Sequence, residues 1–219
     1  MISKNKKLII LMPPKTASNS IRALLQQFEY VFSTHLKMVL PQIHLRLSEI
    51  IDLHDVTDLS EYKIIQITRN PYHRYVSSFF HQNRIIPEKC NLSFKNYNLT
   101  EFSKHLLDSK KSNNFIESFY GDTSFINNSI KRGESWGGSR LFDTQVSWDD
   151  IGTNVEYFKL ENLTTDISEL KNFLGVSLKK LPLINSWGLT NHMDLITPEI
   201  KDIVVELFDE DFTKFNYTK

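Results

Sequence analysis

Two segments of the sequence carry side chains whose types and spacing suit the binding of phosphate groups. The first, residues 13–20, reads Pro-Pro-Lys-Thr-Ala-Ser-Asn-Ser and lies between a short apolar run and an amphipathic segment. A turn from a strand into a helix exposes unpaired backbone N–H groups at the positive end of the helix dipole, and such turns bind anions. Lys15 adds a positive charge, the small residues Ala17, Ser18 and Ser20 allow close approach, and the hydroxyl groups add donors. A helix-capping turn with a chance lysine explains the same residues, and the glycines of a Walker A loop are absent.

The second segment starts at Arg69, directly after an apolar run, and continues into a helical pattern that contains Ser77. Open α/β folds bind their ligands in the crevice at the carboxyl edge of the sheet. Arg69 at a strand end and Ser77 in the second turn of the next helix can both face that crevice. A guanidinium group together with a hydroxyl suits a terminal phosphate monoester. In the alternative interpretation, Arg69 and Arg74 are ordinary surface residues that form ion pairs.

The elements that must position these segments alternate between strands and helices. The segment at residues 7–12, which is continuously apolar from Leu8 onward, predicts a strand that is buried on both faces, and residues 30–34 and 62–68 predict two more. Helices are predicted over residues 18–30, from about 45 to 53 and from 71 to 84. This alternation predicts an α/β fold with a parallel sheet flanked by helices.

The C-terminal half is predicted to be rich in loops and helices. Five of the seven glycines lie between residues 121 and 152, which indicates a loop-rich segment. A strand is predicted at residues 157–160, and a helix at 163–174 with Gly175 at its C-cap. The last long helix is predicted at residues 198–208 with Thr197 as its N-cap. The length favours one domain over residues 1–219.

Composition and charge exclude several classes of protein. The 26 Lys and Arg residues balance the 26 Asp and Glu residues, which argues against bulk, sequence-independent binding of nucleic acid. Cys90 is the only cysteine, so no intramolecular disulfide can form, and a reducing compartment is favoured. The apolar run near the N-terminus is too short for a secretory signal or a membrane span. We therefore expect a cytoplasmic protein without a membrane span.

The two segments together resemble the motifs of sulfotransferases that use 3′-phosphoadenosine 5′-phosphosulfate. Residues 8–18 resemble the loop that binds the 5′-phosphosulfate, and residues 69–77 resemble the motif that binds the 3′-phosphate. The likeness covers nearly the whole chain. It continues through residues 157–163, the Pro-x-x-Asn-Ser pattern at 182–186, and residues 197–199 and 211–217.

Within this superfamily the chain looks most similar to carbohydrate sulfotransferases of the uronosyl 2-O type. Residues 14–18 and the sequence Gly138-Ser139-Arg140, with Gln145 five residues further on, carry this likeness. The membrane anchor and the extra cysteines of the animal enzymes are missing from this sequence. The resemblance implies a P-loop-like fold, 3′-phosphoadenosine 5′-phosphosulfate as cosubstrate, no metal, and an acceptor hydroxyl on a saccharide. The donor-binding residues implied are Pro14, Lys15, Thr16, Ala17, Ser18, Asn19, Ser20, Arg69 and Ser77.

Sulfuryl transfer to a hydroxyl needs a base for the acceptor proton and positive charge beside the departing phosphate oxygens. Lys15 supplies the charge. In the 2-O-sulfotransferases the base is a histidine at a strand end before the corresponding helix, and His44 falls nearest to that place. His35 is the second candidate. Packing is the favoured role of the tryptophans, although one of Trp136, Trp148 and Trp187 could stack on adenine.

Two other functions fit parts of the sequence. A P-loop kinase needs a Walker-type glycine loop and a carboxylate for Mg²⁺, but the third predicted strand ends in Thr68-Arg69 where that carboxylate is expected. A nucleotide-binding module of the same fold that has lost its chemistry is the third hypothesis. The presence of Lys15, Arg69, Ser77 and a positioned histidine argues against this hypothesis without excluding it.

Overall fold

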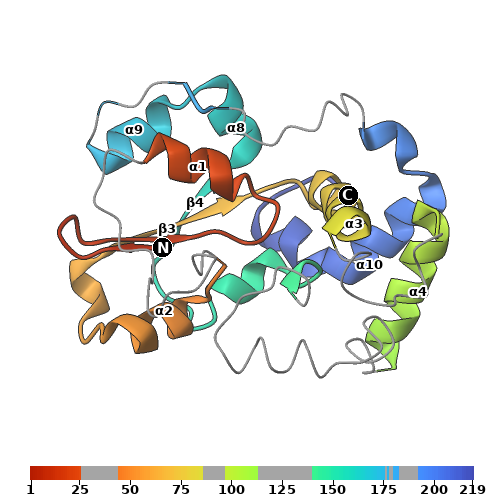
Figure 1. The fold of residues 1–219 in the computed structure, drawn as a ribbon, viewed down its shortest axis with the longest axis horizontal. Helices are drawn as coiled ribbons and strands as arrows, with labels where there is room; N and C mark the ends of the chain where they lie inside the picture. The colour runs from red at the N-terminus through yellow and green to blue at the C-terminus, as the bar shows by residue number, and fades with distance from the viewer. Residues whose placement is uncertain (26–43, 86–96, 113–139, 176, 178–179, 183–191) are drawn as a thin grey trace. The chain divides into compact units, whose positions relative to one another are not determined.

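The structure is a computed structural model, which describes the chain except for residues 26–43, 86–96, 113–139, 176, 178–179 and 183–191 (Figure 1). By its internal contacts the chain divides into two units. The first consists of Met1–Arg69 and Gln145–Gly188, and the second of Asn70–Thr144 and Leu189–Lys219. The following sequence features lie outside the described residues: the predicted strand at 30–34, His35, Cys90, Trp136, Trp187, Gly138-Ser139, Asn185-Ser186 and most of the glycine-rich segment.

In the part of the chain that the structure describes, four strands form a sheet at the centre of the first unit. Its strands β1 (Ile2–Ser3), β2 (Leu8–Leu11), β3 (Lys63–Thr68) and β4 (Glu156–Lys159) lie in the order β1-β2-β3-β4. β2, β3 and β4 are parallel, with Ile10 opposite Ile65 and Ile67 opposite Phe158. The predicted parallel sheet of an α/β fold is confirmed, and the short antiparallel β1 is an addition to it.

Alternation of side chains along β2 divides the apolar interior of this unit into two clusters. Leu8, Ile10 and Met12 pack with residues of α1 (Ser18–Leu24), α8 (Leu160–Thr165) and α9 (Ser168–Leu174). Ile9 and Leu11 point to the other face and pack with α2 (Leu47–His54) and Trp148. Figure 1 shows α1, α8 and α9 on one face of the sheet and α2 on the other. Both faces are covered, as the continuously apolar sequence of β2 predicted.

The single helix predicted at residues 163–174 is wrong, because two short helices replace it. α8 begins at Leu160, within the predicted strand, and the backbone of Asp166 is extended at the end of α8. The carboxylate of Asp166 accepts hydrogen bonds from the N–H of Ser168 at 2.8 Å and from its hydroxyl at 2.9 Å. A short acidic side chain competes for backbone donors in this way and interrupts a helix. α9 then ends as predicted, with Gly175 in the left-handed conformation at φ 66°.

The second unit is built from helices α3 (Pro71–Ile85), α4 (Leu99–Lys111) and α10 (Pro198–Lys214). The amide side chain of Asn98 caps α4, and the Thr197 hydroxyl accepts a hydrogen bond from the N–H of Ile200 at the start of α10. α10 continues six residues beyond the predicted end at 208, through non-helical angles at Phe208. Among the described helices, none combines the length and the apolar character needed to cross a membrane. The shared core is rich in aromatic rings, including Tyr75, Phe79, Phe102, Phe142 and Phe212.

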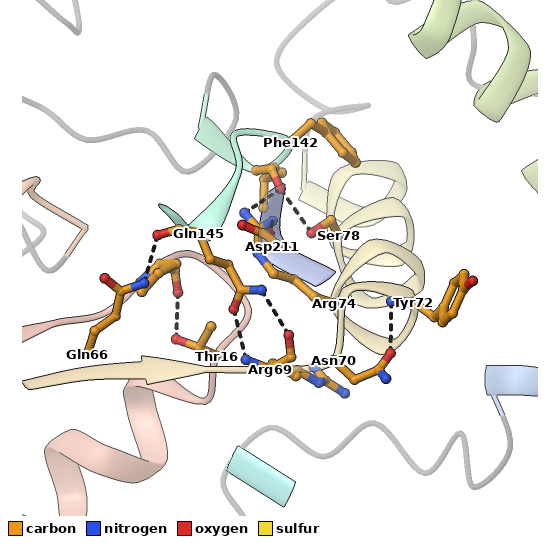
Figure 2. Close-up of polar contacts among 12 residues, drawn as sticks. Thr16, Gln66, Arg69, Asn70, Tyr72, Arg74, Ser78, Phe142, Gln145 and Asp211 are labelled. Carbon is orange, nitrogen blue, oxygen red and sulfur yellow. Dashed lines mark hydrogen bonds and ion pairs between the residues drawn. The ribbon is translucent and has the colours of Figure 1, made fainter. Parts of the chain in front are cut away.

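Arg74 lies in this core and not at the surface, so the interpretation of Arg74 as a surface ion-pair residue is wrong. Its guanidinium group is 3.9 Å from the buried carboxylate of Asp211 on α10 and donates to the carbonyl of Leu141 at 3.2 Å. The hydroxyl of Ser78 donates to the same carbonyl at 3.3 Å (Figure 2). Burying a charge is unfavourable unless it is paired and hydrogen-bonded, so these contacts are required for α3 to pack as it does.

We expect the Asp211→Asn substitution to lower the free energy of unfolding by about 3 kcal/mol, because it leaves the charge of Arg74 buried without its counter-charge. Asp209→Asn on the same helix is the matched control, since Asp209 pairs only with Lys219 among these contacts and both side chains are about half exposed. Its effect should stay within about 0.5 kcal/mol. Urea denaturation of both variants measures the difference, and equal effects would contradict the importance assigned to the buried pair.

Candidate active site

The loop between β2 and α1 has an unusual backbone. Lys15 and Ala17 both lie in the left-handed region, with φ values of 70° and 62°. This conformation costs a residue other than glycine about 1 kcal/mol, so contacts of the loop must offset it. Thr16 provides two of them, since its hydroxyl donates to the carbonyl of Pro13 at 2.7 Å and its N–H reaches the same carbonyl at 3.3 Å. The hydroxyl of Thr16 therefore stabilises the turn.

The other sequence-predicted loop residues lie around this turn. Pro14 and Ser20 are buried, whereas Ser18 at the start of α1 is half-buried and Asn19 is exposed. The residue preceding the helix, Ala17, has no side chain that can cap it. The loop is thus held by its backbone and by Thr16.

Arg69 directly follows β3, and its side chain reaches the loop after β2. Its guanidinium Nη1 donates to the carbonyl of Lys15 at 3.0 Å. The two parallel strands end at the same edge of the sheet, which explains why residues separated by 54 positions meet there. From the sequence, the two segments are expected to be separate binding elements. In the structure, Arg69 is joined to the loop of residues 13–17 that contains Lys15, called the lysine loop below.

The positive charges of Lys15 and Arg69 act on each other. Burial of the Lys15 side chain, with a smaller contribution from the positive charge of Arg69, lowers the pKa of Lys15 to about 8. No acidic side chain among the described residues counters this shift. Two cations held together in a partly buried place attract an anionic group, because an anion would reduce their mutual repulsion.

The main chain of Arg69 is held by Gln145, the first residue of the short 3₁₀ helix η2 (Gln145–Trp148). Gln145 Oε1 accepts from the N–H of Arg69 at 2.8 Å, and Gln145 Nε2 donates to the carbonyl of Arg69 at 2.9 Å (Figure 2). The carbonyl of Gln145 in turn accepts from Nε2 of Gln66 on β3 at 2.7 Å. In the sequence, Gln145 stands out only as part of a resemblance, because no periodic or spacing signal connects it with Arg69.

His44 lies beside the end of β2. Its Nδ1 is 2.7 Å from the carbonyl oxygen of Met12, three residues before Lys15. Since a carbonyl oxygen can only accept, Nδ1 carries the proton, and Nε2 is the unprotonated nitrogen of the neutral ring. The structure therefore brings His44 to the strand that leads into the lysine loop. His35, the alternative base, is outside the described residues.

Ser77 lies on α3, at a half-buried position of the second unit. The side chain of Asn70 starts this helix by accepting from the N–H groups of Tyr72 at 3.0 Å and His73 at 3.4 Å. This local structure is the helix start that was predicted at Asn70-Pro71. Trp148 is fully buried in the core of the first unit, which confirms the packing role for this tryptophan. In the described part of the chain, no three His, Cys, Asp or Glu side chains are grouped so that they could hold a metal ion.

Comparison with known proteins identifies the family. The model of the Sulfotransferase family matches residues 1–218, so the chain belongs to this family. Among solved structures, the chain is similar to a sulfotransferase from Alicyclobacillus acidocaldarius, with 15% identity, 96% of this chain and 94% of that chain covered, and a TM-score of 0.46. A search of curated proteins finds no significant match. Sulfuryl transfer is the reaction class of the family, and the kinase alternative is set aside.

We expect Arg69→Gln to raise the pKa of Lys15 above 8, because a positive charge that lowers it is removed. The pKa should stay below the ordinary value of 10.5, because burial is the larger cause and is unchanged. An NMR titration of ¹³C-methylated lysines measures this, with Lys15→Arg used to assign the signal. Arg22→Ala removes a charge from α1 that does not act on Lys15 and should leave the pKa where it is. An unchanged pKa in Arg69→Gln would contradict the coupling of the two cations.

Proposed function

We propose that the chain transfers a sulfuryl group from 3′-phosphoadenosine 5′-phosphosulfate to a hydroxyl group of a saccharide. The observation that carries this proposal is the pair of cations, Lys15 and Arg69, joined at the carboxyl edge of the sheet in a member of the sulfotransferase family. Such a donor carries phosphate groups at both its 3′ and its 5′ position, and it therefore needs positive charge in more than one place. The partly buried and mutually repelling cations fit that requirement.

Lys15 and Arg69 have different roles in this proposal. The donor supplies a sulfuryl group that is bonded through oxygen to its 5′-phosphate. Lys15 stabilises the negative charge that grows on the phosphate oxygens as the sulfur–oxygen bond breaks, which lowers the barrier. Arg69 holds the 3′-phosphate through its guanidinium fork. Because Nη1 of Arg69 also donates to the carbonyl of Lys15, removing Arg69 should disturb the loop of Lys15 as well.

His44 is the base in this mechanism. The acceptor oxygen attacks the sulfur and gives its proton to Nε2 of His44, while the electron pair of the broken bond stays with the departing phosphate. The hydrogen bond from Nδ1 to the Met12 carbonyl supports this role in two ways. It fixes the ring orientation, and it keeps the proton on Nδ1 so that Nε2 can accept one.

Turnover with sulfur-labelled donor tests the proposal directly. Purified protein is incubated with the donor and with separate panels of polysaccharides, glycolipids and simple alcohols, and transfer of label to the saccharides is expected. Transfer to simple alcohols alone would overturn the saccharide part. Binding of the donor without transfer to any acceptor would instead identify a non-catalytic module of the same fold.

We expect adenosine 3′,5′-bisphosphate to bind at least about tenfold more tightly than AMP, because the charge-assisted bonds to a 3′-phosphate contribute about 1.5–3 kcal/mol each. Arg69→Ala should remove most of this preference, since it removes the group that recognises the 3′-phosphate. Isothermal titration calorimetry with both nucleotides measures the ratio. Arg22→Ala is the control and should keep the wild-type ratio. Equal affinities of the wild-type protein for the two nucleotides would overturn the assignment of the donor.

Loss of the base is tested with His44→Asn, whose side-chain amide can still donate toward the carbonyl of Met12 but cannot act as a base. We expect turnover to fall by about 10²–10⁴-fold with near-normal affinity for adenosine 3′,5′-bisphosphate. In the wild-type protein the rate should rise with pH as an imidazole loses its proton, and this acidic limb should disappear in the variant.

The matched control is His54→Ala, which removes a histidine at the end of α2 in the same unit. It should keep both turnover and the acidic limb. A fully active His44→Asn protein would remove His44 from the mechanism. An inactive His35→Ala protein that still bound the nucleotide would then assign the role to His35.

A further inference from the structure

We propose that Gln145 is the positioning residue of Arg69, and that the preference of the chain for a 3′-phosphate depends on it. This inference rests on the proposed function, in which Arg69 recognises the 3′-phosphate. Gln145 itself needs no contact with the ligand. It acts through the two hydrogen bonds that it makes to the main chain of Arg69.

The position of Arg69 explains why such a residue is needed. The ladder between β2 and β3 ends with Leu11 opposite Gln66, and the ladder between β3 and β4 ends with Thr68 opposite Lys159. Arg69 is the first residue beyond both ladders, so neither β2 nor β4 pairs with it. Its N–H and carbonyl groups still need partners, because an unpaired polar group that is partly buried costs free energy.

The side-chain amide of Gln145 supplies both of those partners. Its amide accepts from the N–H of Arg69 at 2.8 Å and donates to the carbonyl of the same residue at 2.9 Å. Two paired residues of neighbouring antiparallel strands exchange hydrogen bonds in the same manner. The primary amide therefore pairs with the main chain of Arg69 in the way a residue of a neighbouring strand would (Figure 2).

Gln145 is itself held in place. It is fully buried, and its carbonyl accepts from Nε2 of Gln66 at 2.7 Å. Three residues later in the same 3₁₀ helix, the fully buried ring of Trp148 packs among Ile9, Leu11 and Ile50. The backbone of Gln145 is therefore held in place. From this fixed backbone, the side-chain amide accepts one hydrogen bond from Arg69 and donates another to it, which restrains both the position and the orientation of the peptide groups of Arg69.

The other end of Arg69 is restrained by the lysine loop, because Nη1 donates to the carbonyl of Lys15. Without Gln145, the main chain of Arg69 would lose the two hydrogen bonds that restrain it, and more of its order would have to be gained when a phosphate binds. We expect the Gln145→Leu substitution to weaken the binding of adenosine 3′,5′-bisphosphate by about tenfold, a loss typical of one to two hydrogen bonds. The affinity for AMP should change little, because AMP has no 3′-phosphate for Arg69 to hold.

A double-mutant cycle measured by calorimetry tests this inference. The affinities of adenosine 3′,5′-bisphosphate and AMP are determined for the wild-type protein, Gln145→Leu, Arg69→Ala and the double variant. If Gln145 acts through Arg69, Gln145→Leu lowers the ratio of the two affinities in the wild-type background. It lowers it no further when Arg69 is already alanine.

The control for a general loss of stability is Tyr157→Phe, which removes a hydrogen bond to Asp149 in the same unit at 3.2 Å without touching Arg69. It should lower the unfolding temperature and leave the affinity ratio unchanged. If Gln145→Leu does not fold, Gln145→Met carries the test, because its unbranched side chain occupies a similar volume but makes neither hydrogen bond to Arg69. That variant should lower the ratio to a similar extent.

The outcomes separate the two proposals. If Arg69→Ala lowers the ratio but the Gln145 variants keep the wild-type ratio, the inference is overturned and the proposed function stands. An equal loss of affinity for both nucleotides, or the same loss in the Arg69→Ala background, would show a role in folding only and would also overturn it. If Arg69→Ala itself leaves the ratio unchanged, the recognition of the 3′-phosphate by Arg69 fails, and the inference fails with it.

Discussion

The repulsion between two neighbouring cations, Lys15 and Arg69, is a physical constraint that the other contacts at this edge of the sheet must overcome. Burial, and to a smaller extent the positive charge of Arg69, lowers the pKa of Lys15. In the unfolded chain, such groups would move apart and be hydrated separately. Here the parallel pairing of β2 with β3 fixes the two chain segments at one edge of the sheet. The hydrogen bonds of Thr16 and Gln145 then remove the remaining freedom of the two backbones.

This arrangement stores electrostatic free energy in the protein without a ligand. An anion that binds there relieves the repulsion between Lys15 and Arg69, and this relief contributes to its binding free energy. The repulsion is established during folding, before the anion binds. Preorganised charge of this kind is effective in catalysis, because no reorganisation is needed when charge develops in the transition state. Formation of the sheet thus also brings the two cations of the candidate site together.

The sequence predicted the parts of the fold that local patterns determine. The apolar runs of β2 and β3, the helix start at Asn70-Pro71, the N-cap at Thr197 and the C-cap at Gly175 each depend on a few adjacent residues. The break at Asp166 was missed because the apolar spacing continues across it, while the side chain of Asp166 ends one helix and starts the next. Burial of Arg74 was missed because its partner Asp211 is distant in the sequence and both residues are of types usually found at the surface.

The candidate site shows the same division. The lysine loop and the arginine at the end of β3 could be found because each follows an apolar strand directly. The hydrogen bond from Arg69 to the carbonyl of Lys15 joins residues separated by 54 positions. The hydrogen bonds between Gln145 and Arg69 span 76 positions, and no local sequence pattern predicts either contact. His44 was selected through resemblance, and its hydrogen bond to Met12 spans 32 positions.

The left-handed backbone at Lys15 has a consequence for how this protein can change. Glycine is the residue that this conformation favours, and a neutral residue is what burial favours, so a lysine is doubly unsuited to the position on grounds of stability. A search for heat-resistant variants would therefore enrich Lys15→Gly even though the charge is lost. If Lys15 stabilises the departing phosphate as proposed, stability and activity have opposite requirements at this residue. A library scored only on survival after heating would then select for inactive protein.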